Sequence, residues 1–538
     1  MAASLLCGST SVAATLPVPC AVGSCGPAGK NPTSGFTAPT GFVTSGQASA
    51  TQSGNTLTVN QTSSQAILNW ASFNISSDGK VVFQQPGATS IALNKIFQQS
   101  PSSIFGQLSA NGQIYLINPN GIVFGATASV NTAALVASTL GLTSGDTELS
   151  SGIAAQPLTA AGKPQSSFAS DGRIYVTDSS GNNVLDAQGQ PQTVQIVVQP
   201  GAQLTAADGG RVMLLGQNVT NGGTITAPDG QIILAAGQSV YLQASTDPSM
   251  RGLVVQVSGN TPATTTGGVT TPATGTTSNQ TTGALNAARG NVSLLGLAVN
   301  QSGRISASTS VSANGSVYLE AGGYDPTGTC AASAAAICLN QGGTLKVSPT
   351  SEIDLLPDSS QGGTATVGQA QIQSQIKALG QEVDFEGGSI TAPGGNLQVL
   401  AAVNPDVGVQ TVGNTAAQIQ VAAGTNIDLA GSDAVLPMSD NLVSIQLRSN
   451  ELADDPDQHN GALETQTVIV DLRDGRPPII SDTSWQSVLA GVTENILQRT
   501  AVGGQASFQS EGSIVVNNGS TINVSGGAWN YLPGVTQT

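Results

Sequence analysis

Charge, aromatic side chains and histidine are all scarce in this sequence. Charged residues make up 9% and aromatic residues 4% of its 538 residues, and His459 is the only histidine. Few charges leave little of the Lys and Glu that exposed helices carry, and average globular proteins have far more. A Ser-His-Asp arrangement could use only His459, which lies in an acidic stretch. The composition therefore favours short, stacked β-strands joined by tight turns, and no cofactor is expected.

Positive charge is the scarcer sign. Lys and Arg number 15 against 31 Asp and Glu, which gives a net charge of −16. Nucleic acids and anionic membranes are bound through basic patches, so no nucleic acid partner is expected. No run reaches the roughly 18 to 20 apolar residues that a membrane-spanning helix requires. We interpret the acidity as a source of solubility for an exported surface protein.

The first residues are typical of an export signal that lacks its charged front. Leu5 and Leu6 are what remains of an apolar core, and the small residues Val12-Ala13-Ala14 offer a cleavage site after Ala14. Residues 1–14 are therefore interpreted as the remnant of a signal peptide, with a disordered tail as the alternative. Residues 15–44 form a lead-in to the first strands.

Cysteine is rare as well, with five residues in the chain. Cys7 falls inside the signal remnant, which leaves two close pairs, Cys20 with Cys25 and Cys330 with Cys338. Each pair would close a small loop, as disulfides do in an oxidising compartment. Disulfides are predicted, and metal binding is the alternative, although no second thiol pair or histidine lies nearby.

Residues 45 to about 143 alternate between short apolar runs and turn signals such as Asp78-Gly79 and Pro86-Gly87. Residues 133–140 could form a brief helix or one more strand. The predicted strands are Leu57–Val59, Ala66–Trp70, Val81–Phe83, Ile91–Leu93, Ile114–Ile117 and Ile122–Phe124.

A repeat reveals the predicted architecture. Three apolar patches begin at Leu204, Val212 and Val219, and the next three begin about 20 residues later, at Ile225, Ile232 and Val240. This period is typical of one coil of a parallel β-helix, whose coils must stack to bury their inward rows. The phrase GGTITAPDGQIIL at Gly222–Leu234 returns as GGSITAPGGNLQVL at Gly387–Leu400. We predict an all-β, right-handed parallel β-helix (solenoid) of roughly 14 to 18 coils, which makes a rod on the order of 70–85 Å long at ~4.8 Å per coil.

Several segments interrupt the repeat. Residues 144–192, 259–283, 323–341 and 450–461 are polar, of low complexity or cysteine-bearing, and are predicted to be insertions. One short C-terminal helix is predicted over Ser484–Arg499, because Trp485, Val488, Val492 and Ile496 share one helical face after an Asp482 or Thr483 cap. The alternative for this segment is a loop.

Catalytic and metal-binding patterns are weak. Carbohydrate-active β-helices need carboxylates that project from adjacent coils, whereas the acidic residues here concentrate in loops. Asp454, Asp455 and Asp457 could bind calcium, but the spacing of a dedicated calcium loop is absent. No enzyme activity is predicted.

One turn motif has a wider resemblance. Asn118-Pro119-Asn120-Gly121-Ile122 forms a favourable β-turn between two strands, because Pro presets the second turn position and Gly accepts a positive φ. Together with SIALNKI at Ser90–Ile96 and the flanking ANGQIYLINPNGIVFG, it resembles the haemagglutination-activity (two-partner secretion) domain of filamentous haemagglutinin-type exoproteins. Residues 449–454 and TVIVDLRDGRPP at Thr467–Pro478 resemble a segment of large members of this group.

The resemblance implies a function. Residues 45–143 would be the export domain, with Asn118–Ile122 as its secretion motif, and residues 193–538 a β-helical rod. The partner would be an outer-membrane transporter with periplasmic recognition domains, and the protein would be secreted through the periplasm to the outer cell surface as an adhesin for an unknown receptor on a host or neighbouring cell. The alternatives are the truncated stalk of a contact-dependent toxin and a polysaccharide-active β-helix enzyme.

Overall fold

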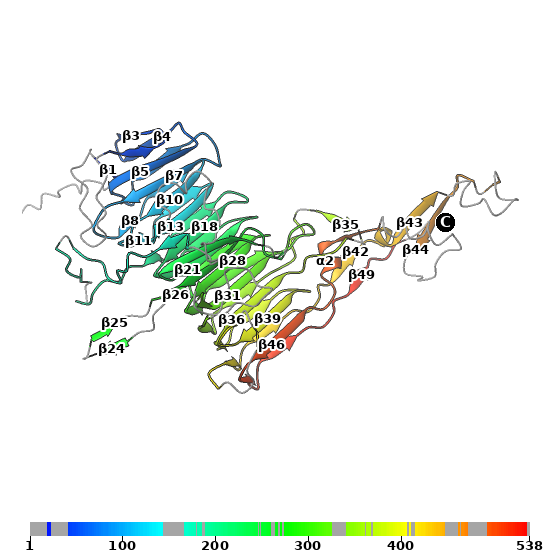
Figure 1. Ribbon diagram of the computed structural model, residues 1–538. Helices are drawn as coiled ribbons and strands as arrows, with labels where there is room; N and C mark the ends of the chain where they lie inside the picture. The colour runs from blue at the N-terminus through cyan, green and yellow to red at the C-terminus, as the bar shows by residue number, and fades with distance from the viewer. Residues whose placement is uncertain are drawn as a thin grey trace, which may run out of the picture.

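The chain winds into a stack of coils with three faces (Figure 1). The computed structural model describes residues 19–22, 41–143, 166–178, 180–185, 189–245, 247, 249–259, 264–266, 269–271, 274–324, 341–360, 362–366, 369–405, 408–409, 415–446, 461–462, 464–471 and 492–534. Each coil adds one strand to each of three parallel sheets. The prediction of an all-β parallel β-helix is confirmed.

Among the described residues, the first sheet contains eleven parallel strands in chain order, and these set the number of coils counted there. Its strands are β5 (Gln65–Ser72), β7 (Ile91–Ile96), β10 (Gln113–Ile117), β13 (Ala134–Ser138), β18 (Arg211–Gly216), β21 (Gln231–Ala236), β28 (Asn291–Gly296), β31 (Ser316–Gly323), β36 (Gln375–Gly380), β39 (Asn396–Ala401) and β46 (Gln505–Ser510).

The second and third sheets complete each coil. The second comprises β8 (Ser102–Ile104), β11 (Ile122–Phe124), β16 (Ile196–Val198), β19 (Asn218–Asn221), β26 (Thr276–Asn279), β29 (Ala298–Gln301), β33 (Thr344–Val347), β37 (Glu382–Phe385), β40 (Gln418–Val421) and β47 (Ser513–Val516). The third comprises β4 (Thr56–Gln61), β6 (Lys80–Gln84), β9 (Gln107–Ala110), β12 (Ser129–Thr132), β17 (Gln203–Ala206), β20 (Thr224–Thr226), β27 (Ala284–Ala288), β30 (Arg304–Ser308), β34 (Glu352–Asp354), β38 (Ser389–Thr391), β41 (Asn426–Asp428) and β48 (Thr521–Asn523).

Inward rows of Val, Ile and Leu form the core. Ile114 of β10 is in register with Leu135 of β13, and Leu135 with Val212 of β18. All three side chains are fully buried, because each coil hides the inward row of the one before it. The six strands predicted between residues 57 and 124 are all present, and residues 133–140 contain strand β13 rather than a helix.

The repeat period is right in two of its three positions. Leu204 pairs with Ile225 and Val212 with Ile232, as predicted. Val219 pairs with Thr277, so the assignment of Val240 to this row is wrong. Val240 lies in β22 (Ser239–Ala244), which leaves the stack and forms an antiparallel hairpin with β23 (Leu253–Ser258). Spacing favoured Val240 because β22 is apolar and buried, whereas the strand that pairs with β19 is the polar β26, which follows much later in the chain.

Within the described residues, the rod is shorter than predicted. Eleven coils at ~4.8 Å each make a stack of roughly 50 Å, against the 70–85 Å expected. The difference arises because many residues that were counted as coils belong instead to segments that loop out of the stack. Strands β13 and β18 pair directly, although residues 139–210 separate them in sequence, so the segment around 144–192 loops out without disturbing the register.

One predicted insertion is wrong in its limits. Low complexity at 259–283 predicted a segment without a core, yet Thr276–Asn279 is strand β26 of the second sheet, with Thr277 and Asn279 fully buried. This polar stretch can lie in the core because its buried side chains are hydrogen-bonded there. Residues 325–340 and 450–460 of the other two insertions lie outside the described residues.

The C-terminal helix is much shorter than predicted. Helix α2 covers only Ile496–Arg499, with a capping box at Asn495 in place of the expected cap at Asp482 or Thr483. Thr493–Asn495 forms strand β45, which pairs with β35 (Thr364–Thr366), so this part of the predicted helix is wrong. The backbone partners in β35 outweigh the helical spacing of Val492 and Ile496. Residues 484–491 lie outside the described residues.

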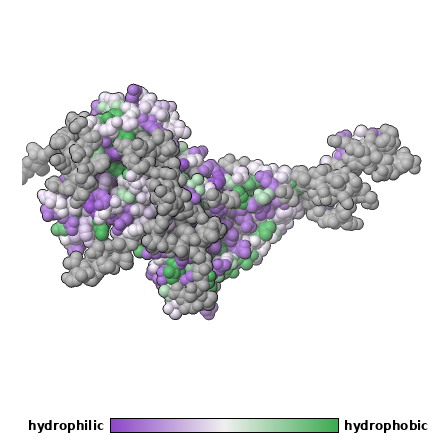
Figure 2. Space-filling model, in the orientation of Figure 1, coloured by the Kyte–Doolittle hydropathy of each residue, from purple (hydrophilic) through white to green (hydrophobic). Residues whose placement is uncertain are grey.

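The N-terminal edge of the stack is covered. Strand β3 (Ala48–Ser53) pairs antiparallel with β4, and β1 (Cys20–Ala21) and β2 (Val43–Ser45) pair antiparallel with β5. Covering strands of this kind block edge-to-edge association. The last coil differs, because Ile514, Val516 and Ile522 are exposed there by 38% to 53%. Elsewhere, Figure 2 shows polar and apolar side chains intermixed on the visible described surface.

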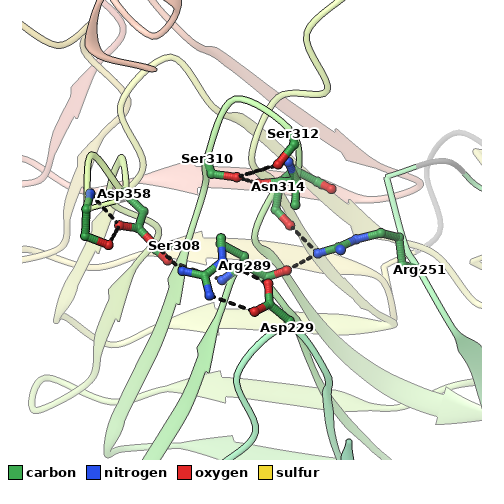
Figure 3. A network of polar contacts seen from close by, with 10 residues as sticks. Asp229, Arg251, Arg289, Ser308, Ser310, Ser312, Asn314 and Asp358 are labelled. Atoms are coloured by element: carbon green, nitrogen blue, oxygen red, sulfur yellow. Dashed lines mark hydrogen bonds and ion pairs between the residues drawn. The ribbon is translucent and has the colours of Figure 1, made fainter. Parts of the chain in front are cut away.

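An ion-pair cluster ties neighbouring coils together at a corner of the stack (Figure 3). The Nε and Nη2 atoms of Arg289 donate to the two carboxylate oxygens of Asp229 at 2.8 and 2.7 Å, and Nη1 lies 2.5 Å from Asp358 Oδ2. Asp229 and Arg289 have φ values of 52° and 54° at equivalent turns of successive coils. The ion pair offsets the cost of this left-handed backbone, which L-residues seldom adopt.

We expect Arg289→Ala to lower the free energy of unfolding by about 1.5 to 3 kcal/mol, the range for hydrogen bonds to charged groups. The Arg289 hydrogen bond is the main cause that lowers the pKa of Asp229, and hydrogen bonds from Ser360 and then Arg289 lower that of Asp358. Both contributions are therefore complete above the ordinary Asp pKa of 3.8 and are lost as pH falls below it. Chemical denaturation at pH 7 and pH 3 measures this difference.

The matched control is Arg304→Ala. Arg304 also pairs with two acidic side chains, Glu352 and Asp354, but its side chain is 53% exposed. Exposed ion pairs contribute up to about 1 kcal/mol. Equal losses for the two variants at pH 7 would contradict the structural role assigned to Arg289.

Candidate recognition site at the Asn-Pro-Asn-Gly turn

Residues 118–121 form a closed β-turn between β10 and β11. The backbone N–H of Gly121 donates to the carbonyl oxygen of Asn118 at 3.1 Å. The N–H of Asn120 donates to Asn118 Oδ1 at 2.9 Å, which is an Asx turn. Gly121 has a φ of 114°, where any other residue would be strained. The residues of the turn itself therefore supply the hydrogen bonds and the backbone freedom that the turn requires.

The side chain of Asn118 joins the turn to the preceding coil. It is fully buried, and its Nδ2 donates to Ser102 Oγ at 3.0 Å and to the carbonyl oxygen of Ser100 at 3.2 Å. Its backbone N–H donates to Ser138 O of the following coil at 3.0 Å. Asn118 thus links three consecutive levels of the stack.

Asn120 and Ile122 complete the contact with neighbouring coils. Asn120 is 3% exposed and donates from Nδ2 to the carbonyl oxygen of Gln98 at 2.7 Å. Ile122 is fully buried, and its N–H donates to Gln195 O at 3.1 Å. Pro119 is half-buried. The polar groups of the motif are therefore directed into the protein.

Arg173 also belongs to this site, and sequence reasoning did not identify it. Its Nη1 donates to Asn120 Oδ1 at 2.8 Å, although 53 residues separate the two. Asp171 holds the guanidinium with Nε and Nη2 at 2.7 and 2.6 Å from Oδ2. The sequence Asp171-Gly172-Arg173 in a chain with few charges was the available signal, but Asp-Gly-Arg also occurs at residues 474–476, and the motif does not indicate which residue Arg173 contacts.

A cavity of about 290 Å³ opens beside the turn. Its lining is mainly apolar and includes Ile96, Phe97, Ile117, Pro119 and Leu142. The other wall is formed by residues 139, 141–143 and 169–171, which lie in or next to strands β14 (Gly141–Leu142) and β15 (Phe168–Ala169). The insertion and the turn therefore share one surface.

Of the four cysteines in the two predicted disulfides, the structure describes one. Cys20, on β1, is disulfide-bonded. Its predicted partner Cys25 lies outside the described residues, as do Cys330 and Cys338. The two pairings stay predictions.

Acidic side chains do occur on strands, contrary to the expectation that they concentrate in loops. Burial and then Glu352 raise the pKa of Asp354, and burial and then Glu382 raise that of Asp384. On neighbouring coils Asp354 faces Thr391 and Asp384 faces Lys346, so no carboxylate pair forms across these coils. His459 and the 454–457 acidic stretch lie outside the described residues, and the absence of enzyme activity stays a prediction.

The described part of the chain also lacks two other kinds of feature. No three His, Cys, Asp or Glu side chains gather there in a way that could hold a metal ion. No helix within the described ranges is both long and apolar enough to span a membrane.

The fold and the buried turn define a β-solenoid protein with a closed, capped N-terminal part. The family model of the TPS secretion domain, the domain of two-partner secretion, matches residues 36–329, more than half of the chain. The chain belongs to this family. Proteins with this domain are exported through the outer membrane to the cell surface or the extracellular space, and the domain implies a partner transporter in that membrane. The matched range extends beyond the predicted limits 45–143.

Individual similarities are more limited in extent. A heme/hemopexin-binding protein of Haemophilus influenzae is 39% identical over 97 residues, which cover 18% of this chain and 11% of that protein. Another heme/hemopexin-binding protein of Haemophilus influenzae is 40% identical over 83 residues, 15% of this chain and 9% of that protein. The aligned stretches thus span about a tenth of these relatives. The crystal structure of the HMW1 secretion domain from Haemophilus influenzae has a TM-score of 0.45 and 20% identity, and the alignment covers 73% of this chain and 86% of that one.

Proposed function

We propose that this exported protein is a surface adhesin whose coil stack carries binding hairpins outside the cell. The observation that supports this role is the hairpin of β43 (Leu442–Gln446) and β44 (Thr467–Asp471). Its strands pair only with each other among the described strands, and the hairpin extends away from the stack (Figure 1). The stack does not require this excursion, because β39 pairs directly with β46 across it.

Export depends, in this proposal, on the secretion motif Asn118–Ile122 and on periplasmic recognition domains of the transporter. An unfolded chain can be bound by strand addition, in which backbone hydrogen bonds supply affinity and side chains supply register. Folding of coil upon coil outside the cell then favours outward movement, because each coil buries apolar surface worth ~25 cal/mol per Å².

The adhesin role predicts a separation of secretion from binding. Replacing residues 442–471 with a short Gly-Ser linker is feasible, because Leu442 and Asp471 are paired neighbours. We expect secretion close to that of the wild type and at least a tenfold loss of attachment to cultured epithelial or bacterial cells, since tenfold corresponds to only ~1.4 kcal/mol of binding.

The matched control removes a different hairpin, β24 (Thr264–Thr266) with β25 (Val269–Thr271), which also lies off the stack. Attachment should persist in that variant. If the 442–471 variant is secreted and attaches like the wild type, the proposed hairpin role is wrong.

Capture of haem or hemopexin is the second candidate. The similarity to heme/hemopexin-binding proteins favours it. Titration of the purified protein with hemin, and separately with hemopexin, tests the two ligands. Saturable binding with failure of cell attachment would replace the adhesin proposal with this one.

A further inference from the structure

The two amide side chains of the proposed secretion motif are not accessible in the folded protein. Asn118 is fully buried and Asn120 is 3% exposed, and all side-chain polar atoms of Asn120 are engaged. A transporter could therefore reach these amides only before the surrounding segments have folded. The order in which those segments form determines how long the motif stays available.

Three of the closing contacts come from residues later in the chain. The N–H of Asn118 requires Ser138 O, and the N–H of Ile122 requires Gln195 O. Asn120 Oδ1 requires Arg173. The preceding coil, through Gln98 and Ser100, supplies the other contacts and is synthesised first.

Arg173 is itself fixed by the chain that follows it. Its carbonyl oxygen accepts from Gln217 Nε2, and Gln217 also donates to Ser170 Oγ at 2.6 Å. Gln217 lies directly after β18, in the coil beyond the insertion, and is 3% exposed. The side chain of Arg173 is 8% exposed, and Asp171 holds its planar fork in place. The contact to Asn120 is thus complete only when residues up to Gln217 have folded.

We propose that Arg173 is a latch on the secretion motif. While the chain is incomplete, Asn118–Gly121 is open to the transporter. When residues 166–217 fold, Arg173 binds Asn120 Oδ1 and closes the motif, which ends its availability to the transporter. Arg173 is a positioning residue, because it acts through Asn120. The inference rests on the proposed reading of this motif by the transporter.

The test compares Arg173→Ala and Arg173→Lys with Arg304→Ala, an arginine whose ion pairs lie elsewhere on the stack. In purified protein, hydrogen exchange at Asn120 and Gly121 should accelerate about tenfold or more in Arg173→Ala, because a charge-assisted hydrogen bond is lost. Exchange in β39 should not change. Arg173→Lys keeps a donor for Asn120 and should restore part of the protection, which a purely steric role would not produce.

The second readout is in cells. Arg173→Ala should still reach the transporter, but should accumulate in complex with it, as shown by crosslinking during a pulse-chase, and should appear in the medium more slowly. Unchanged exchange at Asn120 or unchanged release would overturn the latch. If Arg173→Ala does not fold, Gln217→Ala in the full chain tests the same point, because it removes the donor to the Arg173 carbonyl oxygen and leaves the guanidinium in place.

The failures can be distinguished. If Asn118→Ala and Asn120→Ala are secreted like the wild type, the reading of the motif by the transporter is wrong. If those variants are retained while Arg173→Ala behaves like the wild type in both readouts, only the latch is wrong.

Discussion

Asn118→Ala is expected to reduce secretion about tenfold or more, the factor that corresponds to one lost hydrogen bond to a buried partner. The variant removes the acceptor of the Asn120 N–H and leaves Ser102 Oγ without this donor, in a site with no water access. Asn120→Ala should have a similar effect, because it removes the second amide side chain of the motif together with its hydrogen bond to Gln98 of the preceding coil. The secreted fraction in the medium, relative to the periplasm, is the measurement.

The control for these variants is Asn111→Ala. Asn111 also precedes a glycine, and its side chain exchanges two hydrogen bonds of 2.7 Å with the backbone of Gln85, but it is exposed. Secretion should stay close to that of the wild type, and thermal unfolding of the remote coils should be the same in all three variants. If both motif variants are exported normally, residues 118–121 are a structural turn and nothing more.

Most strands of the stack could be predicted from the sequence, because each strand is marked by its own short apolar run and the turn residues beside it. Each predicted strand of residues 57–124 combines an apolar alternation with a turn signal on either side, and each is present. The 20-residue period placed Leu204 opposite Ile225 for the same reason. The period failed at Val240 because the apolar strand β22 of an excursion lies at the expected spacing, whereas the polar strand β26 takes the position in the coil, and only long-range pairing shows this.

The candidate site also has a part that could be predicted from the sequence and a part that could not. The turn at Asn118–Gly121 follows from the conformational preferences of four adjacent residues, and its link to export came from a resemblance. Arg173 could not be predicted, because its contact to Asn120 spans 53 residues and depends on how the insertion folds back. The role of Gln217 in holding Arg173 depends in turn on the register of the next coil.

Strand β26 shows what composition alone could not indicate. A Thr- and Ser-rich stretch predicted an excursion, yet Asn279 lies in the interior of the stack. Asn221 Nδ2 donates to Asn279 Oδ1 at 2.9 Å, and Asn279 Nδ2 donates to Gln301 Oε1 at 3.1 Å. All three amides are fully buried and lie in register on successive coils. Such an amide ladder replaces apolar packing, because every polar atom within it has a partner.

We therefore expect Asn279→Ala to lower the free energy of unfolding by about 2 to 4 kcal/mol, because it leaves the amides above and below without their partner and opens a cavity. Chemical denaturation followed by circular dichroism measures the change. Asn286→Ala is the control. Asn286 lies on β27 of the same coil, between the buried Leu285 and Ala287, so its side chain is on the outer side, and a change within about 0.5 kcal/mol is expected there. Equal effects of the two substitutions would mean that the ladder does not stabilise the rod, and that the apolar rows beside it carry this level of the stack alone.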